Sequence, residues 1–262
     1  MTQPVSLREK IRSGPTLLGF SLGSMSPAVV EVAGLCGIDF VWIEGEHGSV
    51  DLMHVEHLCR AAELRGVIPM LRVPDGTRAS VLGGLETGAR IIVIPQCHTP
   101  ELAAQIAEYG KFPPEGKRGF NFGSRGLGYG SFGSTPAEVF PRANDATVLL
   151  PQIESVEGVR NAEAIIRTPG IDGVLVGPGD LSMDMGIPGS TTDEELISAI
   201  DGVFALAHKH QKIIATVSPS AELTRRWLAV GVHMLNIGGD LGFVRGGLSA
   251  RIAQMREMMG QG

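Results

Sequence analysis

Eight short apolar runs, each followed by an amphipathic stretch, organise this chain of 262 residues. The runs are apolar along their whole length, which is typical of parallel strands buried on both faces, and the stretches between them have helical periodicity. Eight such units predict an α/β fold, a closed (β/α)8 TIM barrel. An open doubly wound sheet is the alternative, but no glycine fingerprint follows the first run. The predicted strands cover residues 16–21, 39–44, 67–72, 90–95, 147–153, 172–176, 212–217 and 233–237, and the predicted helices cover 26–36, 51–65, 77–86, 99–109, 155–167, 191–210, 219–230 and 240–259.

The length suits one barrel, since (β/α)8 barrels run to about 250 residues as a single unit. We therefore expect a single domain over residues 1–262. One segment, 110–146, is rich in proline and glycine and breaks the alternation. We expect it to be a long loop after strand four, on the face of the barrel that carries active sites. A lid is one role open to it, with Lys117, Arg118 and Arg125 facing an anionic substrate.

Charge and cysteine content limit the partners and the compartment. A formal charge of −6 argues against nucleic acid and anionic membranes, which require a basic surface. No uncharged apolar stretch approaches the roughly 18 residues that span a bilayer, and the first residues lack the apolar core of a secretory signal. Cys36, Cys59 and Cys97 are odd in number and far apart, which favours reduced thiols in the cytoplasm.

Acidic groups follow several of the predicted strands, at the end where barrel enzymes carry their active sites. Strand two ends in Glu44, followed by Glu46 and His47, and strand three ends in Arg72. Alternation along strand two places Phe40, Trp42 and Glu44 on one face, so that Glu44 lies at the mouth of the barrel. Together with Glu154 and Asp180, this mouth would carry up to four carboxylates and a single assigned cation, Arg72.

Glu154 and Asp180 suggest a metal site. They follow strands five and six, which are neighbours in a barrel and lie about 4.8 Å apart. Two carboxylates completed by water and substrate oxygens suit a hard divalent ion such as Mg²⁺ or Mn²⁺. The alternative is that each carboxylate only caps a helix, Asp180 the short one at 181–185 and Glu154 the next.

The segment GPGD indicates how an α-keto acid could bind beside such a metal. Gly177 and Gly179 leave room for close approach, so the amides of Gly179 and Asp180 at a helix start could hold a carboxylate. Arg72 could then neutralise charge on an enolate oxygen, and His47 could move protons near neutral pH. A Schiff-base mechanism is disfavoured because Lys212 begins a predicted strand, at the wrong end, and the other four lysines lie outside the predicted strands.

Three other signals are weaker. Gly128, Gly130 and Gly133 match a nucleotide-binding spacing, but no strand precedes them. Cys97 and His98 follow strand four and could form a nucleophile pair, although neighbours in sequence often point apart. Asp240 in the last loop would repel a phosphate and is better interpreted as a helix cap.

Five segments resemble the HpcH/HpaI family of class II pyruvate aldolases, which includes 4-hydroxy-2-oxoheptanedioate aldolase and 2-keto-3-deoxy-sugar-acid aldolases. They are IEGEHG at 43–48, PMLRVP at 69–74, FPPEGKRG at 112–119, PQIES at 151–155 and VGPGDLSMDMG at 176–186, in order along nearly the whole chain. The resemblance implies a barrel of the phosphoenolpyruvate/pyruvate type. It also implies a hexamer of swapped dimers, in which the last helix is exchanged between partners.

The resemblance also assigns roles to residues. Glu154 and Asp180 would bind a divalent metal ion (Mg, Mn or Co) to which pyruvate is chelated. Gln152 would contact the pyruvate or the metal's water, and the amides of Gly179 and Asp180 would hold the pyruvate carboxylate. Arg72 would stabilise the enolate, and His47 would transfer protons together with metal-bound water. The family usually has aspartate where this chain has Glu44 and Glu86, the latter supporting the histidine of a neighbouring subunit. Both changes keep the charge and add one methylene.

The resemblance implies reversible cleavage of a 4-hydroxy-2-oxo acid into pyruvate and an aldehyde, through a metal-bound pyruvate enolate. Two alternatives stay open: an acyl-CoA or oxaloacetate lyase or decarboxylase of the citrate-lyase β type, and a non-catalytic ligand-binding barrel. The sequence names neither the aldehyde, nor the physiological metal, nor the pathway.

Ile252, Met255 and Met259 form an apolar stripe near the C-terminus, which predicts a homo-oligomer unless the stripe packs on its own barrel.

Overall fold

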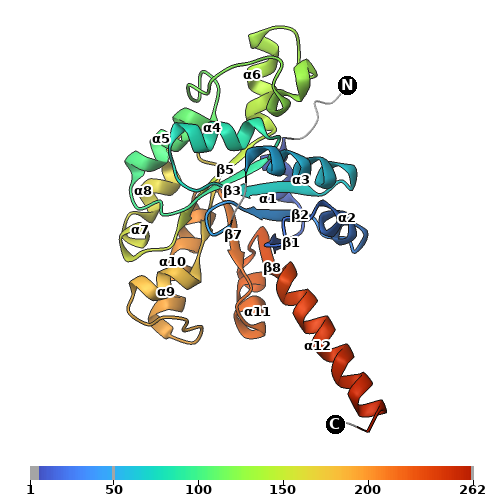
Figure 1. Cartoon of the computed structure of the whole chain (residues 1–262). Helices are drawn as coiled ribbons and strands as arrows, with labels where there is room; N and C mark the ends of the chain where they lie inside the picture. The colour runs from blue at the N-terminus through green and yellow to red at the C-terminus, as the bar shows by residue number, and fades with distance from the viewer. Residues whose placement is uncertain (1–5, 49–50, 261–262) are drawn as a thin grey trace.

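A computed structural model describes residues 6–48 and 51–260 and contains a closed barrel of eight parallel strands (Figure 1). Each strand pairs with the next, and β8 pairs with β1, so the barrel closes. The prediction of a (β/α)8 TIM barrel is therefore confirmed. The strands are β1 Leu17–Leu22, β2 Phe40–Glu44, β3 Ile68–Arg72, β4 Ile91–Ile94, β5 Val148–Ile153, β6 Gly173–Val176, β7 Ile213–Val217 and β8 Met234–Gly239.

Helices follow the strands and pack around the barrel (Figure 1). Several begin at a side-chain cap, as in α5, where Thr99 accepts a hydrogen bond from the amide of Leu102. None of the described helices is long and apolar enough to cross a membrane. The helices are α1 Leu7–Ser13, α2 Pro27–Leu35, α3 Leu52–Leu64, α4 Arg78–Glu86, α5 Pro100–Gly110, the 3-10 helix η1 Arg125–Gly130, α6 Pro136–Asp145, α7 Val156–Arg160, α8 Ala162–Arg167, α9 Pro178–Asp184, α10 Glu194–Lys209, α11 Ala221–Val230 and α12 Asp240–Met258.

Alternate residues of each strand separate two hydrophobic cores. Phe40 and Trp42 point into the barrel with Met70, whereas Val41 and Ile43 pack against the surrounding helices. The predicted alternation along β2 is confirmed, and it directs Glu44 and Arg72, which are register partners, to the mouth formed by the C-terminal strand ends.

The segment 110–146 does not lie on that face, so the prediction of a lid over the active site is wrong. It follows α5 rather than β4, and α5 has already carried the chain back to the N-terminal ends of the strands. The segment is also not one loop, because it contains η1 and α6, the latter begun by a capping box between Thr135 and Glu138.

The three cations proposed for the lid are paired at this opposite end. Lys117 Nζ lies 2.9 Å from Glu108, Arg118 Nη2 lies 3.0 Å from Glu86, and Arg125 Nη2 lies 2.6 Å from Glu63. Glu63 and Glu86 belong to the last turns of α3 and α4. These pairs therefore attach the segment to the end of the barrel where the strands begin. They leave none of the three cations for a substrate at the mouth.

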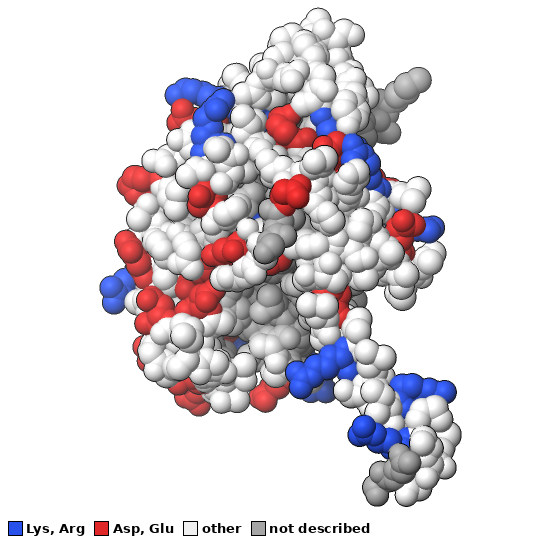
Figure 2. Space-filling view, in the orientation of Figure 1, with Lys and Arg blue, Asp and Glu red and all other residues white. Residues whose placement is uncertain are grey.

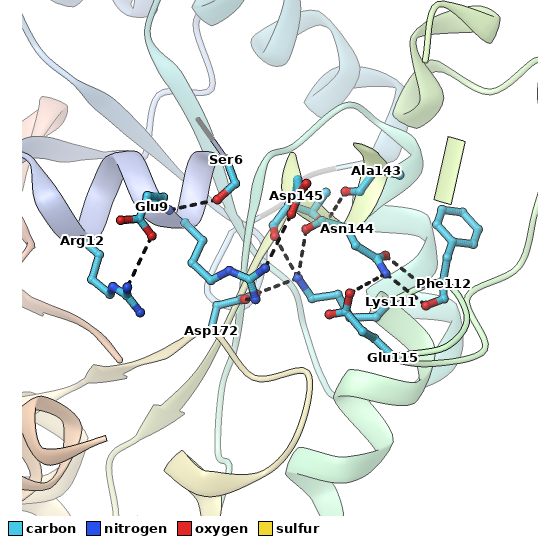
Figure 3. A network of polar contacts seen from close by, with 12 residues as sticks. Ser6, Glu9, Arg12, Lys111, Phe112, Glu115, Ala143, Asn144, Asp145 and Asp172 are labelled. Carbon is cyan, nitrogen blue, oxygen red and sulfur yellow. Dashed lines mark hydrogen bonds and ion pairs between the residues drawn. The ribbon is translucent and has the colours of Figure 1, made fainter. Parts of the chain in front are cut away.

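A buried ion pair lies at the same end of the barrel, where the strands begin (Figure 3). Lys111 Nζ lies 2.8 Å from Asp172 Oδ2, and neither side chain is exposed to solvent. Lys111 also donates to the carbonyl oxygens of Thr147 at 2.9 Å and Asn144 at 3.3 Å, while Arg8 Nη1 donates to Asp172 Oδ1 at 3.0 Å. This network joins α1 and the end of α6 to the start of β6.

The last helix, α12, projects away from the barrel (Figures 1 and 2). Asp240 anchors its first turn, because its carboxylate accepts the amides of Gly23 at 2.8 Å and Ser24 at 3.0 Å. Beyond Asp240 no described residue of the helix is buried. Its apolar side chains, including Leu248 and Ile252, are exposed in this single chain, so the stripe does not pack on its own barrel.

Candidate active site

Arg72 is the centre of an ionic cluster at the ends of β2 and β3. Its Nε donates to Glu44 Oε2 at 2.9 Å, and its Nη1 lies 3.0 Å from Glu46 Oε2. The guanidinium also lies over the indole of Trp42, 5.2 Å from the ring centroid, and the residue is only 8% exposed. Two carboxylates and one aromatic face therefore hold the cation in a single orientation.

Glu44 also shapes the turn that presents His47. Its Oε1 accepts the backbone amides of Glu46 at 2.7 Å and His47 at 3.1 Å. The imidazole of His47 is exposed, with Nε2 at 3.7 Å from Glu46 Oε2. Burial raises the pKa of Glu46, although the charges of Arg72 and His47 act in the opposite direction. The structure thus brings Glu44, Glu46, His47 and Arg72 together, as predicted.

Glu154 and Asp180 lie on the other side of the mouth. Glu154 is 2% exposed, and its two oxygens accept the backbone amide of Gln96, at 2.8 Å, and the side-chain amide of Gln152. Burial, with a further contribution from the negative charge of Asp180, raises the pKa of Glu154 to about 7. The charge of Glu46 raises it further, so the two sides of the mouth are electrostatically connected.

A cavity of about 570 Å³ opens beside these carboxylates. Asp180, in the first turn of α9, lines this cavity. Gly179, the residue before it, is exposed to solvent. A Cβ atom on Gly179 would meet no atom within 4 Å, so a ligand could approach the backbone there. The cavity is lined by Gln96, His98, Glu154, Ser155, Glu157, Asp180, Met183 and Asp184.

Gly177 allows Gln152 and Glu154 to approach each other. A Cβ atom at position 177 would lie 2.8 Å from Gln152 Nε2 and 2.9 Å from Glu154 Oε2, too close for any side chain. Gln152 is 3% exposed, and its Oε1 has no hydrogen-bond partner among the residues that the structure describes. A buried acceptor of this kind is costly unless a ligand or water satisfies it.

These donors fit a divalent metal ion. Glu154, Asp180 and the free oxygen of Gln152 are all hard oxygen donors, the type that Mg²⁺ and Mn²⁺ prefer. Over residues 6–48 and 51–260, no group of three or more His, Cys, Asp or Glu side chains is arranged around one point as a metal site. The remaining positions around an ion would therefore belong to oxygens of substrate and water, which is typical of a catalytic site.

Glu86 does not belong to this mouth. It ends α4, which runs antiparallel to the strands, and its carboxylate pairs with Arg118 at the N-terminal end of the barrel. Within one chain it therefore cannot act together with His47. The expectation that Glu86 takes part in catalysis thus requires a second copy of the chain.

The structure adds Gln96 to the candidate site and weakens the alternative of a Cys97–His98 nucleophile pair. Gln96 was not predicted, and the only sequence signal for it is its place just after strand four. In the Cys97–His98 alternative, burial raises the pKa of the Cys97 thiol to about 12, which disfavours the nucleophilic thiolate. His98 Nδ1 instead lies 2.6 Å from Ser155 Oγ.

Comparisons with known proteins identify the family and agree with the fold. The profile of the HpcH/HpaI aldolase/citrate lyase family matches residues 17–246. The 5-keto-4-deoxy-D-glucarate aldolase of Klebsiella pneumoniae subsp. pneumoniae is 35% identical over 220 residues, which are 84% of each protein. The solved HpcH/HpaI aldolase from Desulfitobacterium hafniense DCB-2 superposes with a TM-score of 0.89 at 25% identity, covering 97% of this chain and 98% of that one. The solved citrate synthase SbnG gives 0.88 at 28% identity, covering 98% and 100%. The chain belongs to the HpcH/HpaI aldolase/citrate lyase family of carbon–carbon lyases.

Proposed function

We propose that this enzyme is a divalent-metal-dependent class II aldolase that reversibly cleaves a 4-hydroxy-2-oxo acid into pyruvate and an aldehyde. The observation that carries the proposal is the pairing of Glu154 and Asp180 on one side of the mouth with the immobilised Arg72 on the other. An α-keto acid placed between them has a metal position at its oxygens and a fixed cation for the charge that develops on cleavage.

Glu154 and Asp180 would hold the metal ion, with Mg, Mn and Co as candidates. When bound, the ion supplies Lewis acidity that polarises the 2-oxo group. The amides of Gly179 and Asp180 would hold the pyruvate carboxylate, because Gly179 leaves its backbone open. Gln152 would contact the pyruvate or a water on the metal, because its buried Oε1 has no partner among the described residues and can accept a hydrogen bond from such a water.

Arg72 would stabilise the enolate oxygen that forms when the C3–C4 bond breaks. In the cleavage direction a base removes the proton of the 4-hydroxyl group, the aldehyde leaves, and C3 of the enolate then takes up a proton. His47 would transfer protons between the substrate and solvent, because its imidazole is exposed. Glu44 supports both residues, through its ion pair with Arg72 and its bond to the His47 amide.

The proposal includes an assembly. The exposed apolar side chains of α12 require a covering surface, and arginines along the same helix would attract an acidic partner (Figure 2). A second copy of this chain, which carries a net charge of −6, fits both features. The family resemblance favours a hexamer of swapped dimers, in which the partner subunit's Glu86 would support His47. We propose a cytoplasmic location, consistent with three free cysteines, and neither nucleic acid nor membrane as a partner.

The first test follows the methyl protons of pyruvate in deuterium oxide by NMR. Purified enzyme with Mn²⁺ or Mg²⁺ should exchange these protons, and a chelator should stop the exchange. A panel of aldehydes with pyruvate as donor then identifies the second substrate. 5-Keto-4-deoxy-D-glucarate is the first compound to test for cleavage, because the named relatives act on it. Absence of both metal-dependent exchange and cleavage would refute the proposal.

A second candidate function follows from the likeness to citrate synthase SbnG at 28% identity. The same enolate chemistry could serve oxaloacetate or an acyl-CoA donor. Assays with acetyl-CoA plus oxaloacetate, with malyl-CoA, and of oxaloacetate decarboxylation test it directly. Turnover of a thioester that exceeds turnover of every 4-hydroxy-2-oxo acid would favour this candidate over the aldolase.

A further inference from the structure

Gln96 has an unusual backbone conformation at the edge of the candidate active site. It follows β4 after Pro95, and its φ of +55° lies in the left-handed region, which L-residues with a side chain seldom adopt. Its side chain is exposed and makes no hydrogen bond to any residue within the described ranges. The strained conformation therefore serves something other than the side chain's own packing.

The strained backbone directs the Gln96 amide at Glu154. The N–H donates to Glu154 Oε1 at 2.8 Å, while Oε2 accepts from the side chain of Gln152. Among the influences on the pKa of Glu154, this amide bond is the largest that favours the ionised, metal-binding form. The amide thus orients the carboxylate and partly offsets the cost of burying its charge.

Further hydrogen bonds hold the turn that contains Gln96. The amide of Cys97 donates to the carbonyl oxygen of Gln152 at 3.1 Å, and Cys97 is buried. His98 Nδ1 lies 2.6 Å from Ser155 Oγ, and Asn161 donates to the His98 carbonyl at 2.8 Å. The loop after β4 is therefore attached at three successive residues to β5 and to the chain that follows it.

We infer that Gln96 is a positioning residue for the metal ligand Glu154, and that it acts through its left-handed backbone rather than through its side chain. The inference depends on the proposed function, in which Glu154 binds the metal. It makes a specific demand on substitutions: glycine, which enters this region freely, should preserve the site, whereas a β-branched residue should disturb it.

The test compares Gln96→Gly, Gln96→Ala and Gln96→Val in chelator-treated, full-length enzyme. The dissociation constant of Mn²⁺ is measured by electron paramagnetic resonance, and pyruvate methyl exchange is measured in parallel. Gln96→Gly should bind Mn²⁺ within about twofold of the unaltered enzyme. Gln96→Val should bind it about 10- to 100-fold more weakly, as for other groups that orient metal ligands, with Gln96→Ala between the two.

Gln211 offers a matched control. It is an exposed glutamine at φ +54°, but it follows α10 at the opposite end of the barrel, where its carbonyl accepts a bond from Arg12. Gln211→Val should lose thermal stability like Gln96→Val and leave Mn²⁺ binding unchanged. If Gln96→Val does not fold, the ordering of glycine above alanine carries the test.

Two results would overturn the inference. Either Gln96→Val and Gln96→Ala bind Mn²⁺ as tightly as the unaltered enzyme, or Gln96→Gly loses affinity as much as they do. Both differ from failure of the proposed function, in which the unaltered enzyme itself neither binds Mn²⁺ nor exchanges the pyruvate protons.

Discussion

Arg72 and Glu44 face each other from adjacent strands of the barrel, with Arg72 Nε 2.9 Å from Glu44 Oε2. The same guanidinium contacts Glu46 through Nη1, so its donors are arranged around two carboxylates. A lysine carries the same charge but cannot reproduce this planar arrangement. Replacing Arg72 by lysine therefore keeps the positive charge and removes the fixed orientation of the hydrogen-bond donors.

Arg72→Lys should lower the rate of pyruvate methyl exchange by about 100- to 1,000-fold, because the stabilising donor for the enolate is lost. Mn²⁺ affinity should change little, because Arg72 is not a proposed metal ligand. The control is Arg226→Lys, which alters an exposed pair with Asp201. Retention of near-normal exchange in Arg72→Lys would contradict the assigned role.

Glu154→Gln should stabilise the metal-free enzyme at pH 8 and have little effect at pH 4. The folded-state pKa of Glu154 is raised from 4.5 to about 7, so the folded protein disfavours the charged form. Destabilisation therefore develops as pH rises from 4.5 to about 7 and persists above it. The gain from glutamine is at most on the order of 3 kcal/mol.

Urea denaturation at both pH values, with a chelator present, measures this effect. Glu157→Gln is the control, because Glu157 lines the same cavity but is exposed. Adding Mn²⁺ should reverse the ranking at pH 8, since only the unaltered enzyme keeps both carboxylate ligands. If Glu154→Gln is instead less stable than the unaltered enzyme at pH 8 without metal, burial of the charged Glu154 carboxylate does not destabilise the folded protein.

Lys111→Met should destabilise the barrel by about 3–5 kcal/mol, because it removes the buried ion-pair partner of Asp172 and leaves it paired with the partly exposed Arg8. The double variant Lys111→Met, Asp172→Asn should recover part of this loss. Urea denaturation of the two variants measures the difference. Equal stability of the single variant and the unaltered protein would mean that the pair contributes nothing net.

Leu248→Glu together with Ile252→Glu should reduce the assembly to smaller species without unfolding the barrel. Both side chains are exposed on one face of α12, and new charges there would oppose its burial against a partner. Light scattering gives the mass, and circular dichroism confirms folding. Gln254→Glu on the same helix is the control. An unaltered enzyme that is already monomeric would contradict the proposed assembly.

Hydrophobic periodicity, with no glycine fingerprint after the first strand, was enough to predict the barrel. All eight predicted strands lie within two residues of those observed, because residues buried on both faces must be continuously apolar. Alternation also placed Glu44 and Arg72 at the mouth, since the side chains of a strand point to opposite faces in turn. Both properties are local, so a single sequence contains them.

Other features of the protein depend on contacts between segments that are distant in the sequence. Segment 110–146 lies at the opposite end from the site because α5 returns the chain there, and pairs such as Arg118–Glu86 hold it in place. The left-handed conformation of Gln96 exists because its contact with Glu154, just after β5, outweighs the local preference of a glutamine. The raised pKa of Glu154 likewise arises only when burial and Asp180 converge on one point. Local patterns thus specify which residues reach the mouth, and packing between strands specifies their conformations and charges.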